Sequence, residues 1–158
     1  MYLDPFYTVR PALNMATTTT TAILRPPAVY VCVQSGDDEA LVDGYPVCWS
    51  TDGITVGQPT TAMLNCFAGI AIEAIAAFAT PVYSYGLIQV YGYHDGVYVM
   101  AAEATAAAGD TTIPVNGAWY MMTQTAANTG LNFGVVQVLE AYTSTTVSAA
   151  KKAFIHAM

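Results

Sequence analysis

The segment from Cys66 to Tyr93, CFAGIAIEAIAAFATPVYSYGLIQVYGY, is almost free of charged residues and limits the folds open to this chain. An apolar helix needs about 20 residues to cross a bilayer. Glu73 lies within the run, and Pro81 interrupts it before a span of that length is complete. We therefore expect this segment to pack inside the protein or against another protein rather than to cross a membrane.

The residue pattern within this segment favours strands. After Pro81, the sequence VYSYGLIQVYGY is rich in Val, Tyr and Ile, and two glycines interrupt any helical period. Before it, GIAIEAI alternates around β-branched residues and is bounded by Gly69 and the turn-like ATP, although AIEAIAAFA is also compatible with a short helix. We interpret the whole segment as two strands joined by a loop.

The composition fits one domain with an unusually uncharged surface. A chain of 158 residues is long enough to bury one core, and 9% of its residues are charged, against about 25% in ordinary soluble proteins. Such a surface repels its own copies weakly. The composition therefore favours a protein that functions in an assembly or outside the cell.

The net charge of −7 comes from eleven acidic and four basic residues. All four basic residues lie near the ends of the chain: Arg10, Arg25, Lys151 and Lys152. No basic stripe is available to neutralise phosphates, so we expect neither a nucleic acid nor an anionic membrane as a partner. The basic ends are instead suited to acidic patches on neighbouring molecules.

The chain divides into an N-terminal arm and a β domain. Residues 1–27 have no sustained period and contain four prolines and a run of five threonines, which predicts an extended arm, with a disordered tail as the alternative. Residues 28–158 predict roughly ten short strands in a mainly β fold, either a β-sandwich or a β-tulip or barrel-like domain. The clearest strand segments are AVYVCVQS at 28–35, PVCWS and ITV around the turn TDG, DGVYVM at 95–100, TIPV, AWYMMT, FGVVQVLEAY and AFIHA.

Two local features of this domain carry further expectations. His94, Asp95 and Gly96 form a sequence typical of a tight hairpin turn, with a general base as the alternative role of the histidine. IAIEAI and QVLEAY each place Glu-Ala after an apolar alternation, and another strand follows each of them. Either two copies of one strand-loop-strand unit or chance similarity explains that echo.

The sequence lacks the motifs of catalysis and cofactor binding. It contains no G-x-S-x-G, Walker loop, H-E-x-x-H or C-x-x-C, so we predict no enzyme activity, no cofactor and no metal. We expect Asp37, Asp38, Glu39 and Asp43 to form a solvated acidic loop, with calcium binding as the alternative.

The cysteines and aromatic residues also leave alternatives open. We expect the three cysteines, Cys32, Cys48 and Cys66, to be buried free thiols, with one disulfide as the alternative. The eleven tyrosines, Trp49 and Trp119 fill the core and subunit interfaces or form a sugar-binding platform.

Three segments carry a resemblance to phage head decoration (cement) proteins, over roughly residues 60 to 158. They are FAGIAIEAIAAFATPVYSYGLIQVYGYHDGVYV, AAAGDTTIPVNGAWY and FGVVQVLEAYTSTTVSAAKKAFIHAM, which follow the extended arm. The resemblance implies a virion protein that is made in the host cytoplasm and sits on the outer surface of an icosahedral capsid as a homotrimer. There it would clamp neighbouring major capsid subunits.

Under this resemblance the arm would extend over a neighbour. Phe6, Tyr7, Arg10 and Arg25 are the residues expected to contact the capsid or the neighbouring subunit, through strand-like hydrogen bonds and two cationic anchors. Two other functions stay open at this point. One is a carbohydrate-binding β module on a virion or secreted, and the other is a phage tail or fibre subunit.

Overall fold

A computed structural model describes residues 7–10, 28–79, 84–103, 105–124 and 135–157. Across these residues the prediction of a mainly β fold is confirmed: the chain forms ten strands and no helix. Accordingly, no helix in the described part is long and apolar enough to cross a membrane. The strands are β1 (Tyr7–Arg10), β2 (Ala28–Ser35), β3 (Pro46–Trp49), β4 (Thr55–Gly57), β5 (Phe67–Ala71), β6 (Tyr85–Met100), β7 (Thr111–Pro114), β8 (Met121–Thr123), β9 (Val136–Val138) and β10 (Ala149–His156).

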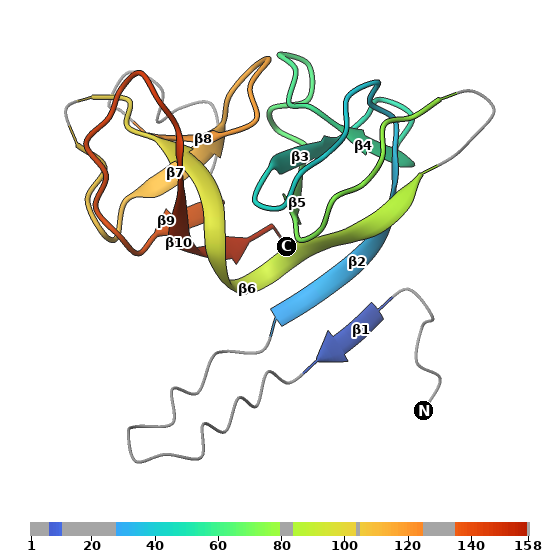
Figure 1. Ribbon diagram of the computed structural model, residues 1–158, viewed down its shortest axis with the longest axis horizontal. Coiled ribbons are helices and arrows are strands. Elements are labelled where there is room, and N and C mark those ends of the chain that lie inside the picture. The colour runs from blue at the N-terminus through green and yellow to red at the C-terminus, as the bar shows by residue number, and fades with distance from the viewer. Residues whose placement is uncertain (1–6, 11–27, 80–83, 104, 125–134, 158) are drawn as a thin grey trace.

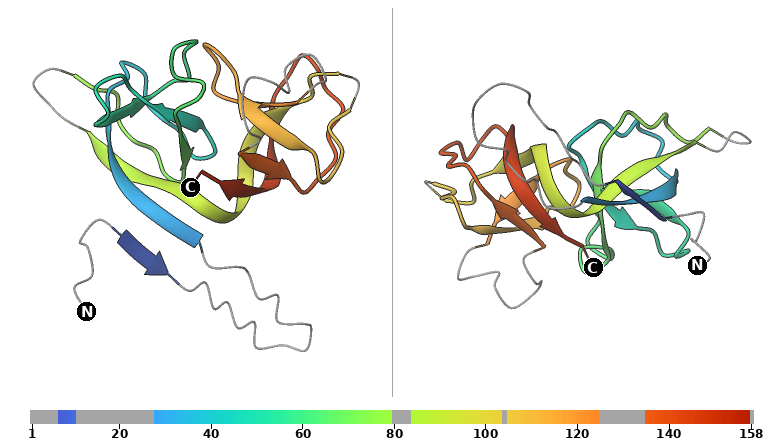
Figure 2. Two further views of the ribbon diagram at one scale, coloured as in Figure 1. Left: turned by 180° about the vertical axis from the view of Figure 1, so that it is seen from behind. Right: turned by 90° about the horizontal axis from the view of Figure 1, so that it is seen from below.

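The ten strands form one sheet that closes on itself twice. The first barrel is the circuit β2-β4-β3-β5-β6, which closes because β6 also pairs with β2. The second barrel is the circuit β6-β10-β9-β7-β8, which closes because β8 also pairs with β6. Closure leaves few free strand edges. Figures 1 and 2 show the two barrels side by side, with β6 running through both.

The long strand β6 replaces the hairpin turn expected at His94, Asp95 and Gly96, so that prediction was wrong. Lys151 of β10 pairs with Val97 and Ala153 pairs with His94, which leaves Asp95 and Gly96 together opposite the single residue Lys152. This arrangement is a β-bulge, which bends a strand without ending its pairing. The chain continues because β10 pairs with β6 on both sides of the irregularity.

One residue of β6 marks the passage from the first barrel to the second. Tyr91 pairs with Val29 of β2 on one edge and with His156 of β10 on the other. The next residue, Gly92, has a φ of 105°, a conformation that favours glycine. The sharp curve of β6 in Figure 1 lies where the strand changes barrels.

The two barrels repeat one topology. In each, the first and third strands are parallel, as β2 with β4 and β6 with β8, and all other pairs are antiparallel. Isolated bridges also repeat, between Leu41 and Ile75 and between Ala106 and Tyr142. The segments IAIEAI and QVLEAY begin within β5 and β9 and end at the bridge residues Ile75 and Tyr142. The echo in the sequence therefore corresponds to a structural repeat.

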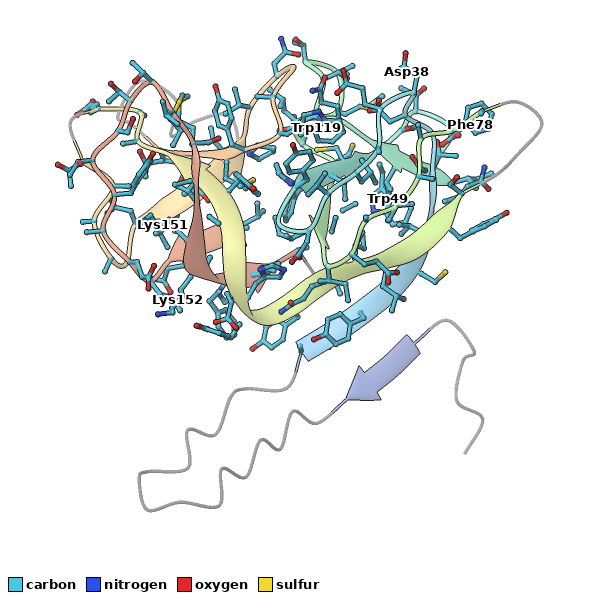
Figure 3. The ribbon with its side chains drawn as sticks, in the orientation of Figure 1. Asp38, Trp49, Phe78, Trp119, Lys151 and Lys152 are labelled. Carbon is cyan, nitrogen blue, oxygen red and sulfur yellow. The ribbon has the colours of Figure 1, made fainter. Side chains whose placement is uncertain are left out.

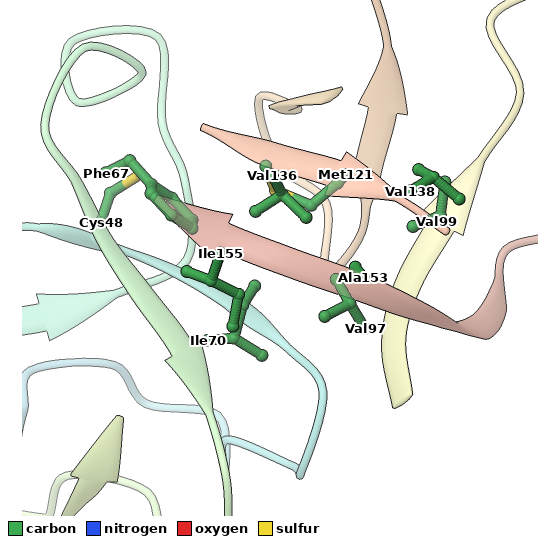
Figure 4. Packing of buried hydrophobic residues seen from close by; sticks show 10 residues of the cluster. All are labelled: Cys48, Phe67, Ile70, Val97, Val99, Met121, Val136, Val138, Ala153 and Ile155. Carbon is green, nitrogen blue, oxygen red and sulfur yellow. The ribbon is translucent and has the colours of Figure 1, made fainter. Parts of the chain in front are cut away.

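The buried side chains join the two barrels into a single domain. One apolar cluster fills the first barrel and includes Leu41, Val56 and Ile88. A second cluster fills the second barrel, but it also contains Cys48, Phe67 and Ile70 from strands of the first. Figure 4 shows these three side chains gathered near Ile155 of β10.

Candidate assembly surface and junction pocket

The strand β1 is the part of the predicted arm that the structure describes. Tyr7 lies opposite Val31 and Arg10 lies opposite Ala28 in an antiparallel pairing with β2. The other two predicted contact residues, Phe6 and Arg25, lie outside the described residues. Sequence reasoning placed the arm on a neighbour but did not identify β2 as an edge that accepts a strand.

The register shows which edge of β2 receives β1. Val29, Tyr30 and Val31 pair with β1 and also with β6, so these two strands lie on opposite edges of β2. Gln34 pairs with both β4 and β6, so β4 shares the edge that β1 occupies. β1 therefore fills the part of the edge that the short strand β4 leaves uncovered.

The same arrangement occurs one step further along the repeat. β6 receives β2 on one edge beside its first half, and β8 follows on that edge at Val99 and Met100. β10 occupies the opposite edge, since both Tyr91 and Val99 also pair with it. β1 thus lies antiparallel on the edge of β2 that corresponds to the edge of β6 on which β2 lies, so this fold already uses that edge for an antiparallel strand.

Aromatic side chains fix the second barrel against the first. The ring of Trp119, in the β7–β8 connection, stacks on Tyr45 with centroids 5.0 Å apart and an interplanar angle of 14°. Its Nε1 donates a hydrogen bond to Oε2 of Glu39 at 2.9 Å, and Tyr98 of β6 meets Tyr45 edge-on at 5.4 Å. Figure 3 shows Trp119 over the first barrel, whereas Lys151 lies on the second. Trp119 thereby contributes to the junction between the barrels.

A polar pocket of about 440 Å³ lies at the same junction. Its lining combines two tyrosines with amide, imidazole and carboxylate groups: Tyr30, Asp43, Ile72, Gln89, Tyr93, His94, Asp95 and Gly96. The side-chain amide of Gln89 donates hydrogen bonds to the carbonyls of Tyr91 and Tyr93. Aromatic rings beside fixed polar groups are suited to a neutral polar ligand.

The buried imidazole of His94 is held by two partners. Its Nδ1 accepts a hydrogen bond from the backbone N–H of Gly96 at 3.0 Å, and its Nε2 lies 3.4 Å from Oδ1 of Asp43. Burial lowers the pKa of His94, while the carboxylates of Asp43 and Asp95 act in the opposite direction. The arrangement fits a neutral imidazole with its proton on Nε2, so this histidine stabilises the bulge in β6.

The acidic loop is ordered by Asp37. The carboxylate of Asp37 accepts hydrogen bonds from the backbone N–H groups of Glu39 and Gln58. Among the described residues, no group of three or more His, Cys, Asp or Glu side chains is arranged to hold a metal ion. One oxygen of this carboxylate therefore fixes the acidic loop, and the other fixes the residue that follows β4.

The three cysteines differ in exposure, contrary to the expectation that all are buried. Cys48 is buried, whereas Cys32 and Cys66 are exposed free thiols. Burial, followed by the nearby Cys66, raises the pKa of Cys48 to about 12. An apolar sequence context does not reveal which face of a strand a side chain occupies, which explains the error for Cys32 in β2, and Cys66 lies just before β5 begins.

The repeated Glu-Ala sequence places a carboxylate at equivalent points of the two barrels. Oε1 of Glu73 accepts the backbone N–H of Leu87 at 2.8 Å. Oε1 of Glu140 lies 2.7 Å from Nζ of Lys152, and hydrogen bonding with Lys152 lowers the pKa of Glu140. Leu87 and Lys152 are equivalent because each accepts at its carbonyl a hydrogen bond from the residue before the glutamate. Each glutamate thus tethers β5 or β9 to the next long strand.

No protein-family model matches this chain, and no curated protein matches it.

Proposed function

We propose that this chain is a structural virion protein, a decoration protein that stabilises an icosahedral phage capsid by clamping neighbouring major capsid subunits. The observation that carries the proposal is the arrangement of β1, a short strand that adds to an open sheet edge and is separated from the barrel body by residues 11–27. Strand addition binds through backbone hydrogen bonds. It needs no catalytic group, in keeping with an assembly role rather than an enzymatic one.

The barrel body has the properties that a clamp requires. The two barrels share β6, and the Trp119–Tyr45 stack and the common apolar cluster hold them together. A body of this kind transmits force between two contacts instead of yielding at a linker. Pressure from packaged DNA is then resisted by many modest contacts, repeated over every copy on the shell.

The distribution of charge supports contact with neighbouring subunits. Residues 28–92 contain six acidic residues and no lysine or arginine. The basic residues lie elsewhere, Arg10 and Arg25 in the arm and Lys151 and Lys152 in β10. Opposite charges at separate places on one molecule favour contacts between the basic part of one copy and the acidic part of the next, as in a closed homotrimer.

The experiment that tests this proposal is binding to expanded, undecorated capsids. We expect the full chain to co-sediment with shells and to raise the temperature at which they break. A chain lacking residues 1–27 should lose shell binding while its thermal unfolding shows that the barrels remain folded. Val147→Ala serves as the control, because it changes an exposed side chain outside the arm and leaves every charged residue in place. Undiminished binding of the folded, truncated chain would contradict the role of the arm.

A second candidate function is carbohydrate binding, and the junction pocket is the observation that favours it. Tyr30 and Tyr93 line this pocket together with the amide of Gln89. A glycan array probed with the full chain tests this function, with Tyr93→Ala as the variant expected to lose any signal. The third possibility, a tail or fibre subunit, predicts long polymers, which light scattering distinguishes from small closed oligomers.

A further inference from the structure

We propose that β1 is exchanged between copies, so that β1 of one chain occupies the edge of β2 at Ala28–Val31 in a second copy. This inference rests on the proposed assembly role and names the partner of the arm as another copy of this chain. The pairing seen within one chain supplies the geometry: four residues of β1 lie antiparallel to four residues of β2. No other strand among the described residues pairs with β1.

The connection between β1 and β2 is much longer than their pairing within one chain requires. Arg10 and Ala28 are register partners, so their Cα atoms need to be only about 4.5 to 5.5 Å apart. A hairpin closes this distance with as few as two residues. Residues 11–27 provide 17 residues instead, enough to reach roughly 56 to 61 Å when extended. A connection of this length allows β1 to reach the same edge on a neighbouring molecule.

The edge of β2 that accepts β1 corresponds to the edge of β6 that accepts β2. Within the chain, β6 accepts β2 on the edge that β8 later continues. The corresponding edge of β2 is uncovered before β4 begins, and β1 pairs there, closer to β4 than β2 lies to β8 on β6. The backbone of β2 makes the same hydrogen bonds whether β1 comes from the same chain or from a second copy. Exchange therefore requires no new contact, only that each arm moves to the next molecule.

Engineered disulfides between differently tagged copies test the exchange directly. In a background with Cys32→Ser and Cys66→Ser, one copy carries Val9→Cys and the other carries Val29→Cys, a register pair in the structure. A second combination uses Thr8→Cys with Tyr30→Cys. Adjacent pairs alternate between wider and narrower Cα spacing, so one of the two combinations has the narrower spacing of about 4.5 Å. The control combines Val9→Cys with Val147→Cys, which is exposed but is not a register partner of β1.

After the two copies are unfolded, mixed, refolded and oxidised, we expect a covalent heterodimer on a non-reducing gel for a register pair and none for the control. A single chain carrying both Val9→Cys and Val29→Cys should then yield covalent oligomers. The exchange is overturned if the mixed copies give no heterodimer, or if the doubly substituted chain forms only an intramolecular bond. Shell binding is measured on the same preparations, so that exchange without shell binding refutes the capsid role alone, and shell binding without exchange refutes this inference alone.

Discussion

The repeat supplies a matched pair of glycines for testing how the barrels are joined. Gly44 and Gly109 stand at equivalent positions, because their N–H groups donate to the carbonyls of Ala71 and Val138 at 2.8 and 2.7 Å. Both have a positive φ, 88° and 101° respectively. Their surroundings differ: a Cβ on Gly44 would lie 2.0 Å from the carbonyl oxygen of Gly96 in β6, whereas a Cβ on Gly109 would meet nothing within 4 Å.

The two alanine substitutions therefore separate two costs. A non-glycine residue in this backbone conformation costs about 1 to 3 kcal/mol, and both variants incur that cost. Gly44→Ala also forces the segment before β3 away from the part of β6 that pairs with β10, where the N–H of Tyr98 donates to the carbonyl of Gly44 at 3.1 Å. Overpacking of this kind typically adds about 1 to 3 kcal/mol. We expect Gly44→Ala to be less stable than Gly109→Ala by about that amount, which corresponds to roughly 2 to 12 °C in Tm.

Urea unfolding followed by circular dichroism measures the difference, with the dependence of the free energy on urea compared between variants to confirm that the same surface unfolds. Thermal unfolding of the same proteins gives the Tm shift. The reasoning is refuted if Gly109→Ala costs as much as Gly44→Ala or more, since the contact between Gly44 and β6 would then contribute nothing to the stability of the junction.

Two further predictions follow from the titratable groups. Burial holds the pKa of His94 below its usual 6.5, so the unfolded chain binds the proton more readily, and stability is lost as pH falls through 6.5 towards the lower folded value. Urea unfolding at about pH 7.5 and 5.5 should show this loss, and His94→Asn should reduce it, with His156→Asn as the control. An unchanged loss in His94→Asn would contradict the assignment. Because burial raises the pKa of Cys48 to about 12, a thiol reagent should modify only Cys32 and Cys66 in the native protein and all three cysteines after unfolding; modification of Cys48 before unfolding would show that its site opens.

Strand positions could be predicted from the sequence wherever apolar alternation was bounded by turn residues. AVYVCVQS at 28–35 coincides with β2, and the turn at Asp52 and Gly53 separates β3 from β4 as expected. Asp52 makes this turn local, because its carboxylate accepts the backbone N–H groups of Ile54 and Thr55. Features of this kind depend on neighbouring residues only, so a sequence pattern carries them.

The closure of the sheet could not be predicted in this way. It depends on pairs far apart in the chain, such as Ser35 with Val56 and Val99 with Met121, and no local pattern specifies them. The error at His94 has the same origin, since Asp-Gly after a histidine fits a turn and a bulge equally well. Pairing with β10 on both sides of the bulge decides between them. The junction pocket was missed for a related reason, because Tyr30, Asp43 and Gln89 meet only when the pairing of β2 with β6 closes the first barrel.

The β3–β4 and β7–β8 hairpins differ in what they contact. In the β3–β4 turn the N–H of Gly53 donates to the carbonyl of Ser50, and in the β7–β8 turn the N–H of Ala118 donates to the carbonyl of Val115. The β7–β8 connection, residues 115–120, is one residue longer than the β3–β4 connection, residues 50–54, so Trp119 and Ile54 lie in corresponding connections but not at one register position. Trp119 stacks on Tyr45 of the preceding barrel, whereas Ile54 is 67% exposed.

The same asymmetry governs the long strands. β6 receives β2 from the preceding barrel, but β2 has no preceding barrel within the described chain and receives the short strand β1 instead. Among the described residues, the β7–β8 connection and β6 thus contact a preceding barrel, whereas the β3–β4 connection and β2 have none to contact. A second copy that supplies β1 to the edge of β2 also approaches the side of the molecule where the repeat is incomplete. Exchange of the arm and a directional contact between copies are for this reason expected to occur together.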